Sequence, residues 1–306
     1  MDKRKIIIDT DPGIDDAVAL AIALHSNKMD VKLITTVCGN VGIEHVTNNT
    51  LKLLTFFGKD VPVAKGAYRP LINAPIDASN VHGVSGMDGY DFGEPNMNLL
   101  LPVHAVEALR TTLSQSKERM TIVAIGPLTN IALLLRLYPD LAEKIEELVM
   151  MGGTITRGNS GVLAEYNFHA DPEAAKIVFE SGIKIVVAPL DVGLKALIYP
   201  ADSEKIKTMN KIGDMFYNLF KRYRGGSFGT GLKMYDGCAI AYLLCPDMFE
   251  KTEVHVAIET KSELTYGASL VDLRGYLNRE NNAVVLTDID EDLFKSWFFE
   301  SIENCN

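Results

Sequence analysis

Short apolar runs rich in Val, Ile and Leu alternate along the chain with stretches in which apolar residues recur at helical spacing. This alternation predicts a parallel β-sheet covered by helices on both faces, because parallel strands are joined by helices that cross the sheet. The predicted strands cover residues 5–9, 31–37, 121–125, 147–151 and 183–190. The predicted helices cover residues 15–25, 43–57, 102–114, 129–138, 172–181, 211–223, 236–244 and 290–302.

The alternation continues without a Gly/Ser-rich linker, a low-complexity tract or a repeat. We therefore predict an α/β fold, an open and mostly parallel Rossmann-like sheet, in a single domain over residues 1–306. Two long Gly-rich loops, residues 68–101 and 152–169, contain polar sequences such as HGVSGMDGYDF that favour a functional role. Ligands of open α/β sheets bind beyond the carboxyl ends of the strands. Residues expected at those ends are Asp11, Asn40, Ile125, Gly152 and Asp191.

The acidic composition limits the partners of the protein. With 40 acidic and 30 basic side chains the formal charge is -10, which disfavours nucleic acid and anionic membranes and leaves small molecules as ligands. The apolar run AVALAIAL (17–24) is far shorter than the roughly 20 residues of a membrane-spanning helix, and the first residues lack the apolar core of a signal peptide. The four cysteines form no CxxC pair, which is typical of reduced thiols. We predict a cytoplasmic protein.

Four aspartates, Asp9, Asp11, Asp15 and Asp16, directly follow the first predicted strand in the sequence IIIDTDPGIDDA. The Pro-Gly turn is expected to bring all four close together. Two carboxylates about 5 Å apart repel by roughly 3 kcal/mol, whereas a helix N-terminus returns about 0.3–1 kcal/mol per acid. A bound divalent cation offsets this repulsion, and a site made of oxygen ligands favours Ca²⁺ or Mg²⁺.

Two other interpretations compete with a metal site. Asp15 and Asp16 suit the first turn of a helix, and Asp9 could bind neighbouring backbone, although capping accounts for only one or two of the acids. Phosphatases of the haloacid dehalogenase type also begin with an apolar strand and a DxD sequence. Their pattern continues with Thr or Val where this chain has Gly13, and it has no need of the following pair of aspartates.

Seven sequence stretches, read in order along the chain, match the motifs of one known enzyme family. They are DTDPGIDDA (9–17), TTVCGN (35–40), VHGVSGM (81–87), AIGPLTNIA (124–132), VMMGG (149–153), GNSGVLAEYNFHADPEAA (158–175) and DGCAIAY (236–242). With these motifs the chain resembles the nucleoside hydrolase family over nearly its whole length, and within that family the bacterial non-specific ribonucleoside hydrolases. The resemblance implies hydrolysis of the N-glycosidic bond of ribonucleosides to ribose and free base, with the help of Ca²⁺.

The resemblance also implies roles for the acidic residues. Ca²⁺ would be held by Asp11, Asp16, Asp236 and the backbone carbonyl of Ile125, together with water and the 2′ and 3′ hydroxyls of the ribose. Asp11 would also act as general base on the attacking water. Asp15 would bind the 2′ hydroxyl, and Asp9 would support the metal ligands.

Further residues match positions that surround the nucleoside in this family. Asn159, Glu165 and Asn167 would contact the sugar hydroxyls, Asn40 would support them, and Met151 would line the sugar pocket. The departing base needs a proton or a strong hydrogen-bond donor, for which the candidates are Tyr235, His82 and Tyr223. Several of these residues also have a purely structural interpretation. Asn159 and Asn167 could be turn asparagines, His82 an ordinary loop histidine, and Tyr223 an aromatic residue that packs a helix.

At one position the chain departs from the family pattern. Many broad-specificity members carry His directly before the metal-binding aspartate, whereas here Tyr235 precedes Asp236. Tyrosine is a weaker acid than histidinium at neutral pH, so purine turnover is the activity that this change affects most. The alternative function is therefore a catalytically weak nucleoside-binding protein that keeps the metal and ribose site. The resemblance further implies a homodimer or a homotetramer.

Overall fold

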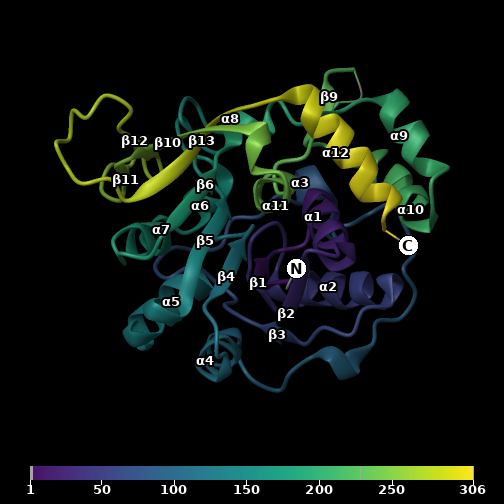
Figure 1. Cartoon of the computed structure of the whole chain (residues 1–306), viewed down its shortest axis with the longest axis horizontal. Helices are drawn as coiled ribbons and strands as arrows, with labels where there is room; N and C mark the ends of the chain where they lie inside the picture. Colours follow the sequence, from purple (N-terminus) through teal and green to yellow (C-terminus); the bar gives the residue numbers. More distant parts are fainter. Residues whose placement is uncertain (1–2, 228, 306) are drawn as a thin grey trace.

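One eight-stranded β-sheet runs through the molecule, in the order β10-β13-β6-β5-β4-β1-β2-β3 (Figure 1). The computed structural model describes residues 3–227 and 229–305. The neighbouring strands of this sheet are parallel except for β10 and β13, which are antiparallel. The strands are β1 (Arg4–Thr10), β2 (Met29–Thr36), β3 (Val63–Lys65), β4 (Met120–Ala124), β5 (Ile145–Met151), β6 (Ile185–Ala188), β10 (Phe249–Val254) and β13 (Ala283–Ile289).

Both faces of the sheet are buried, which explains the continuous apolar runs of its central strands. In β1, Ile6 and Ile8 belong to one hydrophobic cluster and Ile7 belongs to the other. The helices on the first face are α1 (Ile14–His25), α2 (Ile43–Phe57), α9 (Pro200–Lys207), α10 (Lys211–Phe220), α11 (Gly237–Leu244) and α12 (Glu291–Glu303). Those on the second face are α4 (Ala105–Gln115), α5 (Thr129–Leu137) and α7 (Pro172–Phe179).

The strand order fixes where the chain has room for a ligand. Strands β2 and β3 extend the sheet to one side of β1, and β4, β5 and β6 extend it to the other side. The direction of winding therefore reverses between β1 and β4. A crevice forms at such a reversal, beyond the carboxyl ends of the strands.

Most of the predicted elements are confirmed, and the main errors lie at the edges of the sheet. All eight predicted helices are present within three residues at each end; helix 211–223, for example, ends at Phe220. The strand predicted over 183–190 is too long, because it ends at Ala188 and α8 (Leu190–Gly193) begins at once. Missed elements are β3, β10, β13, α9, the short helices α3 (Ser79–His82) and α6 (Tyr166–Ala170), and the small sheets β11–β12 (Val256–Ile258, Ser269–Val271) and β7–β9–β8 (Leu197–Ile198, Gly231–Lys233, Gly226–Ser227).

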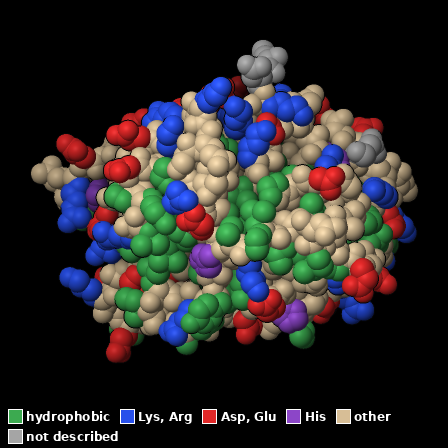
Figure 2. Space-filling view, turned by 90° about the horizontal axis from the view of Figure 1, so that it is seen from below, with side chains coloured by type: hydrophobic (Ala, Val, Ile, Leu, Met, Phe, Trp, Pro, Cys, Tyr) green, Lys and Arg blue, Asp and Glu red, His purple; other side chains and the backbone are tan. Residues whose placement is uncertain are grey.

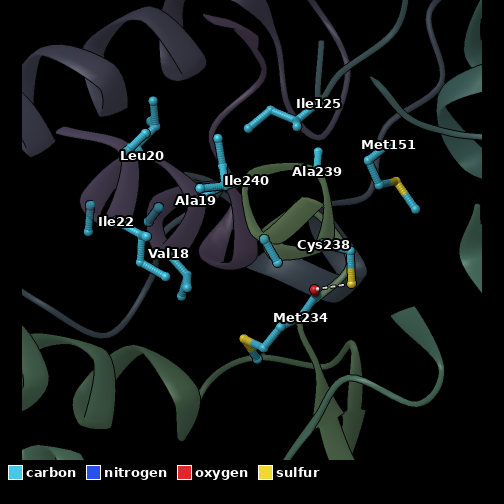
Figure 3. Close-up of a cluster of buried hydrophobic side chains, with 14 of the residues drawn as sticks. Val18, Ala19, Leu20, Ile22, Ile125, Met151, Met234, Cys238, Ala239 and Ile240 are labelled. Atoms are coloured by element: carbon cyan, nitrogen blue, oxygen red, sulfur yellow. Dashed lines mark hydrogen bonds between the residues drawn. The ribbon is translucent and has the colours of Figure 1, made fainter. Parts of the chain in front are cut away.

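Helix α1 packs against α11, and this contact brings two distant parts of the chain together. In Figure 3, Val18 and Ala19 of α1 lie beside Ile240 of α11, within one buried apolar cluster. The thiol of Cys238 donates to the Met234 carbonyl at the start of α11 (3.5 Å). Because the two helices are packed side by side, the acids at their N-terminal ends lie close together at the sheet edge.

The surface carries hydrophobic as well as charged side chains. Figure 2 shows hydrophobic side chains gathered near the centre of the face that is seen from below in Figure 1. Val103, just before α4, and Leu137, at the end of α5, are among the exposed apolar residues. In the described part of the chain, no helix combines the length and the apolar character that a membrane crossing requires.

Candidate active site

A cavity of about 460 Å³ opens at the carboxyl edge of the sheet, next to the ends of β1, β4 and β5. Among the residues to which the resemblance gives a catalytic, substrate-binding or metal-binding role, only Asp11 and Asp16, which are fully buried, do not line it. The predicted residues in its wall are Asp15, Asn40, His82, Ile125, Met151, Asn159, Glu165, Asn167, Tyr223, Tyr235 and Asp236. Residues that are far apart in the sequence are therefore brought together in one place, although their roles stay predictions.

Asp11 and Asp16 are held by Asn40. The Asn40 backbone N–H donates to Asp11 Oδ2 at 2.6 Å, and its side-chain amide donates to Asp16 Oδ2 at 3.1 Å. Asp16 also accepts hydrogen bonds from the Thr10 hydroxyl (2.7 Å) and from the Gly13 N–H (3.0 Å) at the start of α1. Asn40 and the first turn of α1 thus fix the orientation of both carboxylates.

Three carboxylates meet at the floor of the cavity, where Asp15 and Asp236 line it and Asp16 is fully buried beside them. One oxygen each of Asp15, Asp16 and Asp236 lies within 4.8 Å of the other two, and all three residues are buried. Burial is the main cause that raises the pKa of each, to about 7 for Asp15. Within the described residues, the only basic side chain within 4.0 Å of these acids is His82, which is 3.9 Å from Asp15. Their mutual repulsion is therefore not balanced by an ammonium or guanidinium group.

The donor set at this floor suits a hard divalent cation. Asp11 Oδ1 and Asp15 Oδ1 are buried and have no hydrogen-bond partner, which is costly for a carboxylate unless a proton or a cation binds there. All of these groups are oxygens, the ligand type that Ca²⁺ and Mg²⁺ prefer. The closest trio contains Asp15, whereas the sequence resemblance assigned Asp11 to the metal and Asp15 to the sugar. The Ile125 carbonyl, also an expected ligand, accepts a hydrogen bond from the Asn167 amide (3.3 Å).

Asp9 is not part of this trio, although its Oδ2 is also buried without a hydrogen-bond partner. Its Oδ1 accepts hydrogen bonds from the Thr35 hydroxyl and from the Asn130 amide (2.8 Å). Asn130 also donates to the Thr36 carbonyl and accepts from the Ala67 N–H, so it links three segments behind the site. Burial raises the pKa of Asp9 to about 7. Asp9 is therefore held by Thr35 and Asn130, and its support of the metal ligands stays a prediction.

The loop over residues 158–169 forms the opposite wall. Asn167 donates through its amide to the Met151 carbonyl (3.1 Å), which ties this loop to the end of β5. Glu165 caps α6 by accepting from the N–H groups of Asn167 and Phe168, and it also accepts from Gly153 N–H. Its carboxylate is therefore already engaged with backbone, and burial raises its pKa to about 7. The side-chain oxygen of Asn159 accepts from the Tyr166 N–H (2.9 Å).

The groups expected near the base are all neutral donors. His82 Nδ1 accepts from the Ile14 N–H at 3.1 Å, and burial lowers the pKa of His82 to about 4. The imidazole is therefore uncharged at neutral pH, and its proton is on Nε2. Burial raises the pKa of both Tyr223 and Tyr235, so both hydroxyls keep their protons. The rings of His82 and Tyr223 lie 5.4 Å apart, and a Cβ on Gly13 would come within 2.5 Å of His82, so only glycine leaves room for this ring.

Two further residues expected at the cleft, Gly152 and Asp191, do not line the cavity, and other residues that do line it were not predicted. Asp191 was expected at the cleft, but it accepts hydrogen bonds from Thr154, Ile155 and Thr156 and so braces the loop after β5. His169 lines the cavity and pairs with the Ser160 hydroxyl (2.7 Å). Tyr166 also lines it, and its hydroxyl contacts two other segments. No spacing rule reveals these contacts; only the place of Tyr166 between Glu165 and Asn167 was a signal.

Comparison with known proteins agrees with this architecture. The sequence model described as inosine-uridine preferring nucleoside hydrolase matches residues 6–296. The chain is 48% identical over 295 residues to the non-specific ribonucleoside hydrolase RihC of Salmonella paratyphi C and to that of Salmonella typhi, with 96% of each chain covered.

Solved structures are similar over the same extent. An inosine-guanosine nucleoside hydrolase superimposes with a TM-score of 0.91 at 28% identity, covering 99% of this chain and 98% of the other. A purine-preferring ribonucleoside hydrolase from Gardnerella vaginalis gives a TM-score of 0.91 at 25% identity, with 99% of both chains covered. Fold, cavity and similarity together define an enzyme of the glycosidase class, a ribonucleoside hydrolase. The chain belongs to the nucleoside hydrolase family.

Proposed function

We propose that this enzyme hydrolyses the N-glycosidic bond of purine and pyrimidine ribonucleosides and that the reaction depends on Ca²⁺. The observation that supports calcium is the floor of the cavity, where three buried carboxylates lie within 4.8 Å and two carboxylate oxygens have no partner. Asp11, Asp16, Asp236 and the Ile125 carbonyl are the proposed ligands, and Asp15, because its carboxylate belongs to the closest trio, is the fifth candidate. A bound divalent cation would neutralise these acids and acidify a water molecule at the site.

One group of residues serves the attack of water on the sugar, and another group serves the departure of the base. Asp11 takes the proton of the attacking water, whose oxygen forms a bond with the anomeric carbon as the bond from that carbon to the base nitrogen breaks. The carboxylates around the sugar stabilise the positive charge that develops on the ribosyl group. Asn159, Glu165 and Asn167 orient the sugar hydroxyls, with Asn40 holding Asp11 and Asp16 in place.

The base departs toward His82, Tyr223 and Tyr235. Each of these residues is uncharged at neutral pH. His82 carries an N–H group and Tyr235 an O–H group, whereas the Tyr223 hydroxyl donates to the Lys233 carbonyl (3.1 Å) and would have to exchange that partner for the base. Neutral donors stabilise a departing anion by hydrogen bonding more than by full proton transfer. We therefore expect bases that leave readily as anions, such as uracil, to depart faster than those that need protonation.

The test is a steady-state panel of inosine, adenosine, uridine, cytidine and xanthosine, with ribose release measured at saturating calcium. Turnover is expected on uridine and is expected to be lost in Asp11→Ala. Deoxyuridine is expected to be a poor substrate, since it lacks the 2′ hydroxyl that would bind Asp15 and the metal. Equal rates on uridine and deoxyuridine would contradict the assignment of the sugar site.

The absence of a cationic group among His82, Tyr223 and Tyr235 supports a second candidate, a nucleoside-binding protein with weak catalysis. Calorimetric binding beside turnover separates the two functions. Tight binding of ribonucleosides without formation of reducing sugar would favour the second candidate and exclude the first.

We also propose a cytoplasmic homodimer or homotetramer. Cys38, Cys238, Cys245 and Cys305 are all unpaired, which suits a reducing compartment. Apolar side chains gathered on the face seen in Figure 2 are of the kind that association would cover. Light scattering coupled to size-exclusion chromatography tests the assembly, and a monomer at all concentrations would refute it.

A further inference from the structure

Tyr166 connects three segments of the cavity wall. It is the first residue of α6, directly after the cap residue Glu165, and it lines the cavity. Its hydroxyl lies 2.8 Å from the carbonyl oxygen of Gly39 and 3.2 Å from that of Ile76. One hydroxyl proton is shared between these two acceptors, and the shorter contact is to Gly39. The loop that carries the expected sugar-binding residues is thereby joined to the segment that holds Asp11.

The Gly39 carbonyl and the Asn40 N–H belong to the same peptide group, which is planar and rigid. On one side this peptide accepts from the Tyr166 hydroxyl, and on the other side it donates to Asp11 Oδ2 at 2.6 Å. A displacement of the peptide at the Tyr166 side is therefore transmitted to the Asp11 carboxylate. The two hydrogen bonds also polarise one another through the peptide group, so each strengthens the other.

Packing confirms how closely this peptide confines Asp11. A Cβ placed on Gly39 would lie 2.0 Å from Asp11 Oδ2, so the backbone of Gly39 is in direct contact with the carboxylate. The other oxygen, Oδ1, has no partner. The Gly39–Asn40 peptide thus determines which oxygen of Asp11 is occupied and which one is left for proton transfer or for a cation.

The hydroxyl of Tyr166 is not needed to build the fold around it. Glu165 supplies the cap of α6, and Asn167 ties the same loop to β5. The segment 76–78 has its own link to the site, because the Ala78 N–H donates to the Asn40 carbonyl at 2.8 Å. Removing only the hydroxyl oxygen leaves these contacts in place.

We propose that Tyr166 is a positioning residue for the reaction, acting through the Gly39–Asn40 peptide to orient the carboxylate of Asp11. This inference rests on the proposed function for the role of Asp11, and it adds a residue that binds neither the metal nor the reacting atoms. It predicts that the hydroxyl affects the chemical step and the affinity for calcium more than it affects the binding of substrate.

The test compares wild type, Tyr166→Phe and the control Tyr217→Phe. The control removes an exposed hydroxyl of α10 that donates to Glu204 of α9 (2.7 Å). At saturating calcium, Tyr166→Phe is expected to lower kcat on uridine by about tenfold, the effect of one lost hydrogen bond, with KM changed by less than about threefold. Calorimetric titration of the metal-free proteins with calcium should give a Kd weaker by about three- to tenfold in Tyr166→Phe. Tyr217→Phe should match the wild type in all three quantities.

Different outcomes separate this inference from the function on which it rests. A raised KM with unchanged kcat and unchanged calcium Kd would mean that the hydroxyl serves the Ile76 segment, and the inference would be overturned. Unchanged values throughout would overturn it as well. If the wild type releases no ribose from any ribonucleoside, the proposed function fails, and the calcium Kd of Tyr166→Phe still decides whether the hydroxyl orients Asp11.

Discussion

Removal of the divalent ion is expected to lower the stability of the protein and to make that stability depend more strongly on pH. Burial, and then the neighbouring Asp16, raises the pKa of Asp15 from 3.8 to about 7 in the folded protein. The metal-free folded state therefore holds a proton on Asp15 between about pH 4 and pH 7, whereas the unfolded chain has released it. The free energy of unfolding of the metal-free protein should fall as the pH rises through this window.

The structure gives the scale of this effect. About three pH units at about 1.4 kcal/mol each correspond to about 4 kcal/mol for Asp15 alone. Calcium at about a thousand times its Kd returns a similar free energy, about 4 kcal/mol, because it binds only the folded protein. For a chain of this size that corresponds to a rise in Tm of about 8 °C. The rise should be largest above pH 7, where protons no longer compete for the carboxylates.

The measurement is thermal unfolding followed by circular dichroism, with chelator or with excess calcium. Recording it at about pH 5 and about pH 8, on either side of the Asp15 pKa, gives both the pH dependence of the metal-free protein and the stabilisation by calcium. Asp236→Asn removes one carboxylate of the trio and should raise the Tm of the metal-free protein at the higher pH while reducing the calcium response. Asp30→Asn, at a surface pair with Lys32, serves as the control and should leave the calcium response unchanged. A calcium shift that is the same at both pH values, or that survives in Asp236→Asn, would refute the reasoning.

Three further substitutions test individual residues. Asp11→Asn should lower kcat on uridine by about 10²- to 10⁴-fold with little change in Tm, because it removes the general base. A loss of kcat below tenfold would show that another group takes the proton. Tyr235→His should raise inosine turnover relative to uridine, and the gain should fade above about pH 6.5 as the imidazole loses its proton; no gain at acidic pH would exclude Tyr235 as the position of the missing acid. Gly39→Ala should lower kcat because its Cβ would lie 2.0 Å from Asp11 Oδ2, whereas Gly42→Ala, which would meet nothing within 4 Å, is the matched control; equal kcat in the two variants would argue against close confinement of Asp11.

The central part of the fold could be predicted because each of its elements has a local signal. Strand β1 reads as an apolar run because both faces are buried, and α2 was predicted at its observed ends, Ile43 and Phe57. The edge elements have weaker signals. In β10, four of the six residues are exposed, so its sequence FEKTEV does not alternate as a buried strand does. Strand β13 joins the sheet beside β6 only because the chain returns across its edge, which is a property of the whole fold.

The sequence by itself determined the architecture and the presence of an acidic site, because hydrophobic periodicity and runs of like charge are properties of neighbouring residues. Only the tertiary structure decided which carboxylates meet. Asp236 lies close to Asp15 and Asp16 because α11 packs against α1. The carboxylate of Glu165 accepts hydrogen bonds from the backbone N–H groups of Gly153 and Asn167. The contact of Tyr166 with Gly39 joins residues that are 127 positions apart. Such contacts arise when separate elements pack against one another, and no local pattern of side chains encodes them.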